Sequence, residues 1–305
     1  MKLYAAGFNA WGQLSFDQPA DADMGEPDDI HGFSLILEDA RIDVVTSRGD
    51  LVAGVIASDA ARMSGADCLS CSALNGRVVV YDAKEGIIRQ YASAQQPSAS
   101  GHGQSEEFSF ELPGIVQLVA YDVGFAALTS QGKVWVWGDG RFPECLGRGV
   151  EDVVAERPGL VAALEDLPSG PITKIAAGGY AFAAVTRGQD MYCWGRYLGR
   201  QQHRPVLEEL AGEPEPVVVT QGQGDGQQEL DVADVGVGEA HMIVLATDGR
   251  VYVVGSNANG QLGLGKGVES TAPSSWTKID GISADGQRVA GVYAGPRSSF
   301  IVIDS

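Results

Sequence analysis

Short apolar runs alternate with polar or small residues along most of the chain, and turns that contain glycine separate them. The clearest example is GEAHMIVLATDGRVYVVG, Gly238 to Gly255, in which two apolar runs flank Asp248 and Gly249. Asp-Gly and Asn-Gly pairs supply the positive φ angles that tight hairpin turns require. The pattern therefore predicts a β-hairpin.

This hairpin pattern recurs with a nearly constant step. The further copies are GGYAFAAVTRGQDMYCWG (178–195), YDVGFAALTSQGKVWVWG (121–138) and a worn GADCLSCSALNGRVVVYD (65–82). Their last residues, at 82, 138, 195 and 255, are 56, 57 and 60 positions apart, and counting from Gly255 through the C-terminus to Gly7 gives 57. A chain that returns to its start with the same step predicts a closed ring of sheets, a β-propeller.

We expect one all-β domain over residues 1–305, with about six four-stranded blades and with five or seven left open. Residues 288–293 and 299–304 are predicted to form the inner strands of the last blade, which Leu3 to Gly7 would complete. Closure of this kind removes open sheet edges. The interval from Gly7 to Asp82 is long for one blade and short for two. Its strand-like runs at 33–37, 42–46 and 51–56 are interpreted as a degenerate blade beside a nearly normal one.

The run GQLGLGK, 260–266, has the spacing of a phosphate-binding loop, but Gly267 stands where that motif has Ser or Thr. Residues 3–14 closely repeat 252–262, and both copies contain G-x-N-x-x-G-Q-L, the first without a lysine. We interpret the glycines as turn residues that tolerate positive φ, with Leu14 and Leu262 buried beneath the turns.

The stretch from Gly238 to Gly263 reads G-x-x-H-x-x-x-L-x-x-D-G-x-V-Y-x-x-G-x-N-x-x-G-Q-L-G. It resembles the repeat of the regulator of chromosome condensation family of β-propellers. The layout is similar to the small members, among them the fungal alpha-tubulin suppressor, a cofactor of Elongator and diphthamide synthesis, and the propeller that partners a histone demethylase. The resemblance implies structural roles for the repeat residues Gly7, Gly12, Gly138, Gly195, Gly238, His241, Gly255, Gly260 and Gly263.

The residues that could carry chemistry do not form recognised motifs. Cys68 and Cys71 make a C-x-x-C, but no second pair accompanies them, so Cys68, Cys71, Cys145 and Cys193 are interpreted as core residues of a protein from a reducing compartment. No catalytic motif contains any of the four histidines, His31, His102, His203 and His241. We therefore expect neither enzymatic activity nor a cofactor or metal.

Three tryptophans, Trp135, Trp137 and Trp194, alternate along the predicted strands and are expected to pack between blades. The tryptophan-rich G-W-R-H-T signature of the ultraviolet-photoreceptor members is absent, so light sensing is not expected. No apolar run reaches membrane-spanning length and no secretion signal opens the sequence, which predicts a cytoplasmic or nuclear protein.

The chain has 21 Lys+Arg against 40 Asp+Glu, a formal charge of −19, which disfavours direct binding of nucleic acid. Two acidic runs, expected to be solvated rims, comprise Asp17, Asp21, Asp23, Glu26, Asp28 and Asp29, and Glu208, Glu209, Glu213 and Glu215. Arginines and aromatics, which anchor protein interfaces, follow Gly138 and Gly195 on equivalent loops. This predicted partner-binding set is Arg141, Phe142, Arg148, Arg196, Tyr197, Arg200 and Arg204.

We therefore predict a non-catalytic platform, a monomeric propeller that forms a heterodimer with an acidic protein. The resemblance suggests a small zinc-ribbon partner of the Elongator and diphthamide pathways; a nucleosome acidic patch or a demethylase is the other suggestion. The arginines could instead neutralise nearby acids such as Glu151–Asp152 and Glu208–Glu209.

Guanine-nucleotide exchange on a small GTPase is the alternative function. In family members that catalyse exchange, a basic N-terminal tail and an inserted β-wedge take part. Here no basic tail precedes Lys2. Within the loop excess at 83–111, residues 91–105 are interpreted as a flexible solvated loop and not as a shaped wedge, which disfavours this function.

Overall fold

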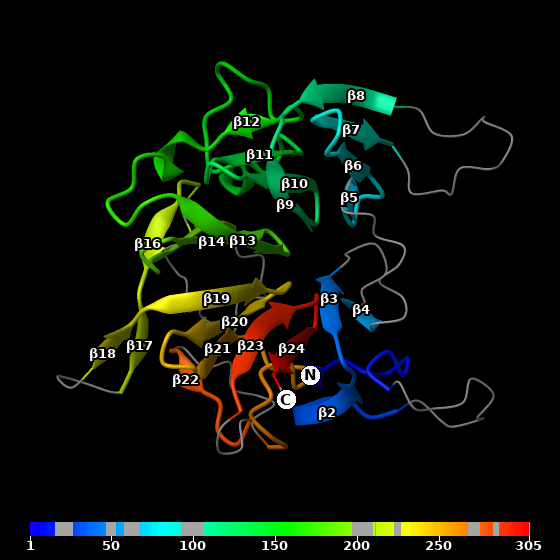
Figure 1. Ribbon diagram of the computed structural model, residues 1–305, viewed down its shortest axis with the longest axis vertical. Coiled ribbons are helices and arrows are strands. Elements are labelled where there is room, and N and C mark those ends of the chain that lie inside the picture. Colours follow the sequence, from blue (N-terminus) through cyan, green and yellow to red (C-terminus); the bar gives the residue numbers. More distant parts are fainter. Residues whose placement is uncertain are drawn as a thin grey trace, which may run out of the picture.

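The computed structural model is a ring of antiparallel sheets (Figure 1). It describes residues 1–15, 27–46, 53–57, 68–92, 106–196, 210, 212–222, 227–267, 275–282 and 287–304. In these ranges the strands form five four-stranded sheets and two two-stranded sheets. The all-β propeller predicted from the repeat is confirmed.

Each four-stranded sheet is one blade, and we number the blades in chain order. Blade I contains β5 (Cys68–Ser72), β6 (Val78–Asp82), β7 (Ile87–Tyr91) and β8 (Glu106–Glu111). Blade II contains β9 (Ile115–Tyr121), β10 (Gly124–Thr129), β11 (Val134–Gly138) and β12 (Gly159–Leu160). Blade III contains β13 (Ile172–Gly178), β14 (Ala181–Thr186), β15 (Met191–Gly195) and β16 (Glu215–Val217).

Blade IV contains β19 (Val232–Val237), β20 (His241–Ala246), β21 (Val251–Gly255) and β22 (Thr277–Lys278). Blade V is built from both ends of the chain: β23 (Val289–Ala294), β24 (Ser298–Ile303), β1 (Lys2–Gly7) and β2 (Ile30–Glu38). The two-stranded sheets are β3 (Ile42–Thr46) with β4 (Ala53–Ala57), and β17 (Val219–Gln221) with β18 (Gln228–Leu230). Two short 3-10 helices, η2 (Pro143–Cys145) and η3 (Ala162–Leu164), flank β12.

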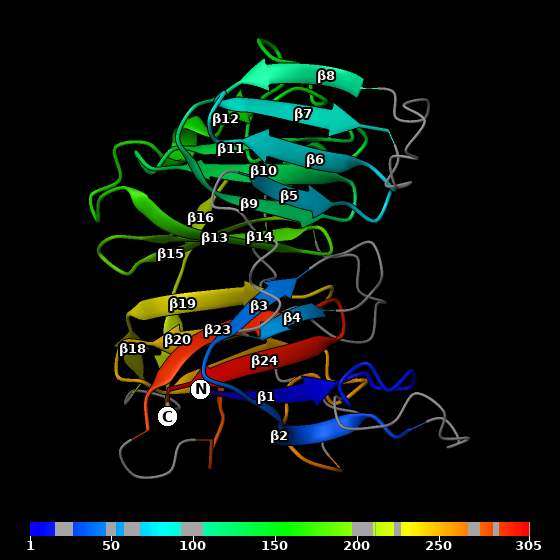
Figure 2. The same cartoon turned by 45° about the vertical axis from the view of Figure 1, so that its right-hand side comes forward.

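Blade V closes the ring, as predicted from the spacing. β1 pairs with β24 from Lys2 opposite Ile303 to Gly7 opposite Ser298, and Figure 2 shows these strands side by side. Leu3, Ala5 and Ala6 of β1 are fully buried, so this strand belongs to the core as well as to the hydrogen-bond ladder. The N-terminal strand therefore completes the blade that the C-terminal strands begin, and so joins the two ends of the chain.

Two assignments in the first 111 residues are corrected. The run at 33–37 lies in β2, the outermost strand of blade V, because the chain turns back after β1 and pairs with it antiparallel. The degenerate blade is the β3–β4 hairpin, which lies between blade V and blade I (Figure 2). The described residues thus contain five complete blades and this reduced one, which agrees with the expectation of about six blades, one of them degenerate.

The segment 83–111, predicted to be a loop, contains strands β7 and β8 of blade I; residues 93–105 lie outside the described part. Alternation marks both strands: β7 buries Ile88 and Gln90, and β8 buries Phe108. The β5–β6 hairpin forms the innermost two strands of its blade, whereas β10 and β11 are the second and third strands of theirs. The 56-residue step from Asp82 to Gly138 therefore joins strands that are not equivalent.

The glycine-rich loops are architectural, as interpreted from the sequence. In both copies of G-x-N-x-x-G-Q-L the asparagine Oδ1 accepts a hydrogen bond from the leucine N–H five residues later, at 2.9 Å for Asn9 with Leu14 and for Asn257 with Leu262. Both leucines are buried. Gly260 has a φ of +76°, and a Cβ there would come within 2.7 Å of His31 Cα. Glycine is thus required by conformation and by space.

The acidic residue Asp29 ties these two loops together. Its carboxylate accepts the Asn9 N–H at 2.8 Å and the Asn259 side-chain N–H at 2.9 Å. Asp29 was predicted to be part of a solvated acidic run. In the structure it instead links the loop after β1 to the loop after β21. Lys266 lies with its Nζ 3.9 Å from the Asp28 carboxylate, on the same side of blade V.

The three tryptophans pack between blades, as predicted. Trp194 of β15 is fully buried in a cluster with residues of blade II and stacks on Phe182, with ring centroids 5.0 Å apart. Trp137 of β11 is buried in a cluster with residues of blade I, and Trp135 packs against the same cluster. Large aromatic side chains thus fill the wedge between neighbouring sheets.

Polar side chains around the centre of the ring, where the innermost strands of the five blades meet, link the inner strands of neighbouring blades. Gln117 of β9 exchanges two hydrogen bonds with the main chain of Ile175 on β13, at 2.6 and 2.9 Å. Asp234 of β19 accepts the Val292 N–H of β23 at 3.1 Å and the Lys174 ammonium of β13 at 2.8 Å. The central cavity of about 230 Å³, lined by β5, β9, β13, β19 and β23, is therefore bordered by polar groups that already have partners.

Deletion of residues 1–7 tests the closure. We expect the thermal midpoint to fall by roughly 10 °C or more, because the deletion removes three fully buried side chains and leaves β24 and β2 without their shared neighbour. The control is Lys2→Ser, which keeps the strand and should melt within about 2 °C of the wild type. Equal melting of the truncated and full chains, followed by circular dichroism, would show that β1 does not hold the ring.

Candidate protein-binding site

The loop after β11 starts with an exposed arginine. The Arg141 side chain is 81% exposed and forms an ion pair with Asp139 of the same turn, with Nη2 2.5 Å from Oδ2. This hydrogen bond from Arg141 lowers the pKa of the Asp139 carboxyl, and the charge of Arg77 adds to the effect. An exposed pair of this kind contributes little to stability, so Arg141 can exchange its partner at low cost.

An aromatic pair joins this loop to blade III. Phe142 packs on Tyr180, which lies between β13 and β14, with ring centroids 4.8 Å apart. The Arg141 guanidinium carbon lies 5.9 Å from the centroid of the Phe142 ring. The aromatic neighbour of Phe142 is therefore Tyr180, while Tyr197, the predicted counterpart, lies outside the described residues.

Arg196, directly after β15, lies on the same side of the ring. Its main-chain N–H donates to the Tyr180 carbonyl at 2.8 Å, and its guanidinium lies 3.9 Å from a carboxylate oxygen of Glu144 in η2. Arg141 lies beside Phe142 and the main chain of Arg196 contacts Tyr180, so the two loops meet at this aromatic pair. Arg200 and Arg204 lie outside the described residues.

Within the described chain, the acids that pair with Arg141 and Arg196 both lie in the segment that follows β11. They are Asp139 and Glu144, whereas Glu151–Asp152 and Glu208–Glu209 were the acids considered from the sequence; residues 208 and 209 lie outside the described part. Both arginines are therefore paired with nearby acids that are half-buried, but the arginine side chains themselves are exposed, so solvent screens each pair. The partner-binding role of the surface stays a prediction.

Arg148 has a different environment from the other predicted contact residues. Its guanidinium donates to five main-chain carbonyls, those of Val136, Gly149, Val153, Val154 and Arg157, at 2.7 to 3.2 Å. Partial burial lowers its pKa. Arg148 is thus a brace for the loop 149–157, and we leave it out of the contact surface. No sequence motif indicates these five hydrogen bonds, so sequence reasoning could not distinguish Arg148 from an exposed contact residue.

The matches to known families decide the class of this ring. Models of the regulator of chromosome condensation (RCC1) repeat match residues 232–261 and 248–302. The chain carries RCC1 repeats. The resemblance drawn from Gly238 to Gly263 is confirmed.

The curated relatives are long proteins that share the repeat region. Mouse HERC2, an E3 ubiquitin-protein ligase, is 30% identical over 209 residues, which are 66% of this chain and 4% of HERC2. Protein pim1 of Schizosaccharomyces pombe is 30% identical over 59% of this chain and 31% of its own length. The ultraviolet-B receptor UVR8 of Arabidopsis thaliana is 27% identical over 67% of this chain and 56% of its own. Because the chain spans 4% to 56% of these relatives, the ligase activity of HERC2 is not carried over.

Solved structures share the propeller fold at low identity. Human WBSCR16 aligns over all of both chains with a TM-score of 0.57 and 13% identity. Prp20p of Saccharomyces cerevisiae aligns over 98% of this chain and 90% of its own, with a TM-score of 0.55 and 14% identity. These matches establish the fold of this RCC1-repeat chain.

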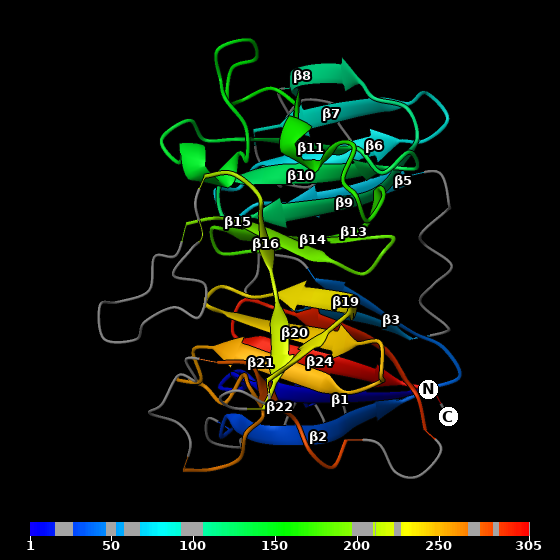
Figure 3. The same ribbon diagram turned by 90° about the vertical axis from the view of Figure 1, so that its left-hand side faces the viewer.

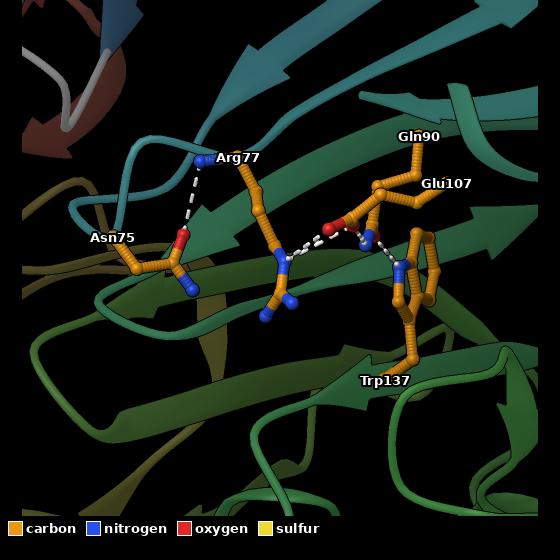
Figure 4. Close-up of polar contacts among 5 residues, drawn as sticks. All are labelled: Asn75, Arg77, Gln90, Glu107 and Trp137. Atoms are coloured by element: carbon orange, nitrogen blue, oxygen red, sulfur yellow. Dashed lines mark hydrogen bonds and ion pairs between the residues drawn. The ribbon is translucent and has the colours of Figure 1, made fainter. Parts of the chain in front are cut away.

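A chain of polar contacts runs from the buried Trp137 of blade II through the buried Gln90 to the exposed edge of blade I in this RCC1-repeat ring (Figure 4). The Trp137 indole N–H donates to Gln90 Oε1 at 2.9 Å, and Gln90 Nε2 donates to Glu107 at 2.5 Å. Arg77 then pairs with Glu107, with Nε 3.0 Å from Oε2. Sequence reasoning missed this network, since a glutamine at an inward position of a strand carries no motif.

Cysteine and metal chemistry finds no support in the described part of the chain. Burial raises the pKa of Cys145 and of Cys193 to about 12, and it also raises the pKa of Cys71. Thiols with raised pKa values are poor nucleophiles and metal ligands near neutral pH. Among the described residues no group of three or more His, Cys, Asp or Glu side chains could hold a metal ion.

His241 is buried on β20, where its ring fills the space beside Gly238: a Cβ at Gly238 would lie 2.1 Å from Cε1. This close fit is consistent with the structural role implied by the family repeat. As for membranes, the described segments contain no helix with the length and hydropathy needed to cross one.

Gln90→Leu tests the network between blades I and II. We expect a loss of about 1–3 kcal/mol in the free energy of unfolding, because the indole N–H and the Glu107 carboxylate lose a buried partner. In a Trp137→Phe background, which lacks the indole donor, the same change should cost less. A double-mutant cycle by urea unfolding measures this coupling, and additive costs would contradict it.

Arg148→Lys tests the brace. A lysine cannot reach five carbonyls with one planar fork, so we expect faster amide hydrogen exchange in residues 149–157 and a loss of roughly 2–3 kcal/mol. Arg141→Lys is the matched control and should leave both unchanged. Hydrogen exchange read by mass spectrometry separates the two outcomes, and unaltered exchange in Arg148→Lys would refute the brace.

Proposed function

We propose that this RCC1-repeat chain is a non-catalytic docking platform, a single propeller over residues 1–305 that binds a protein partner on the side of the ring that carries Arg141 and Arg196. The observation that carries the proposal is the Phe142–Tyr180 ring contact, with the exposed side chain of Arg141 beside Phe142 and the exposed Arg196 in the neighbouring loop. Arginine and aromatic side chains in this arrangement are typical of interface anchors.

The partner we infer is acidic, because a guanidinium binds a carboxylate through two parallel hydrogen bonds. The chain as a whole has a net charge of −19 and repels acidic proteins. A local group of arginines would therefore steer an acidic partner towards this one part of the surface. A small zinc-ribbon protein of the Elongator and diphthamide pathways, in a heterodimer with a monomeric propeller, follows from the family resemblance alone. A cytoplasmic or nuclear location, expected from the sequence, is part of the same proposal.

Nucleotide exchange on a small GTPase is the second candidate. The yeast protein Prp20p, which shares the fold, is described with binding properties to Gsp1p and histones. A release assay with fluorescent GDP on Gsp1p separates the two classes: no acceleration is expected for a platform. Acceleration by catalytic amounts of the chain would replace the platform by an exchange factor.

Charge reversal tests the surface. The variant Arg141→Glu with Arg196→Glu should lose recovered partners at least tenfold in a quantitative pull-down, because reversal replaces attraction by repulsion, a cost of about 2–5 kcal/mol. The matched control is Arg187→Glu with Arg250→Glu, which changes the charge equally. Arg187 and Arg250 lie in the β14–β15 and β20–β21 turns, at the other end of the strands from Arg196.

Thermal melting of both double variants confirms that each is folded before the comparison. If the Arg141 and Arg196 variant recovers the same partners as its control, the site is wrong even where partners exist. If neither the wild type nor the control recovers a partner in stoichiometric amount, the platform function itself is contradicted.

A further inference from the structure

The loop 149–157, which we call the valine loop, exposes three apolar side chains within five residues. Val150, Val153 and Val154 are 42%, 38% and 59% exposed. Single exposed apolar residues are ordinary on protein surfaces, but a group of them marks an interaction site. The loop joins β11 to β12, the outermost strand of blade II; β9, β10 and β11 of this blade are labelled in Figure 3.

The loop is held in this shape from inside. Three of the five carbonyls that bind the Arg148 guanidinium belong to Gly149, Val153 and Val154, and the main-chain N–H of Gly138 donates to the Ala155 carbonyl at 2.8 Å. Ala155 is buried in the core between blades II and III. The valines therefore face away from a fixed base and do not fold back onto the core.

Removing an arginine side chain from water costs free energy. For Arg148, within the described chain, this cost is offset by hydrogen bonds to main-chain carbonyls and not by a salt bridge, and these hydrogen bonds fix the shape of the loop. A loop whose shape is set before binding loses little conformational entropy when a partner binds. The brace thus makes the valine loop a preorganised surface. Arg148, predicted as a direct contact, acts on a partner through the loop that it positions.

The charge around the valines indicates the kind of partner. Glu151, Asp152 and Glu156 are exposed in the same loop, and Arg157, its cation, lies over the Phe108 ring of blade I at 4.4 Å. The surface is therefore apolar with an acidic border. Its complement is a segment with apolar side chains flanked by lysine or arginine.

We propose that the valine loop is a second docking surface, which binds a protein segment carrying apolar and basic side chains. The proposal rests on the platform function, but the partner chemistry is opposite in sign to that expected at Arg141 and Arg196. Two neighbouring surfaces of opposite preference would let one propeller hold two partners, or two parts of one partner.

Selection from a phage library of random peptides on the full chain tests this proposal, with the random library as the probe. Enriched peptides should combine Val, Ile or Leu with Lys or Arg. A synthetic peptide of the consensus should bind at least about tenfold more weakly to a triple Val150→Ser, Val153→Ser and Val154→Ser variant, measured by fluorescence anisotropy. The control is Val116→Ser with Val218→Ser, two equally exposed valines elsewhere, which should bind like the wild type.

A second variant tests the charge: Glu151→Lys with Asp152→Lys should select acidic in place of basic peptides. Arg148→Lys, which keeps every surface side chain, should also weaken the consensus peptide. Arg141→Glu with Arg196→Glu should leave it unchanged, so that a failure of the arginine surface is distinguished from a failure here. Absence of enrichment on the wild type, or equal binding by the triple serine variant, would overturn the proposal.

Discussion

The need to bury both faces of every sheet governs this ring. Shared clusters of buried side chains cover the facing sheets of blades I and II, II and III, III and IV, and IV and V, so a row of blades with two free ends would expose two cores. The chain meets this constraint by placing β1 between β24 and β2, with Leu3, Ala5 and Ala6 fully buried. Hydrogen bonding and apolar burial are thus satisfied by the same strand.

Closure also explains the polar groups between blades. An aromatic wedge such as Trp137 fills the space between blades I and II, but its indole N–H needs a buried acceptor, which Gln90 supplies at 2.9 Å. Gln117 and Asp234 do the same for main-chain groups of neighbouring inner strands. Each link is directional, so it sets the angle between sheets that apolar contacts alone leave open.

The sequence predicted those parts of the fold in which turn chemistry and period agree. Gly132 and Gly249 have φ angles of +79° and +83°, as their hairpins require, and the spacing from Gly255 to Gly7 correctly indicated closure. Prediction failed for β7 and β8 of blade I, because these strands contain a regular alternation but no repeat motif. Register within blade I was equally hidden, since a hairpin with an Asn-Gly turn can form any two adjacent strands of a blade.

For the site, sequence could indicate which residues share a side of the ring but not what each side chain contacts. Arg141 and Arg148 are seven residues apart and of one type, yet the first is mostly exposed and the second binds five main-chain carbonyls, four in the loop 149–157 and one on β11. The difference arises from main-chain geometry: the loop 149–157 curves so that its carbonyls converge on one guanidinium. Five donors in a planar fork suit converging carbonyls, which is why an arginine can organise a loop that contains no regular structure.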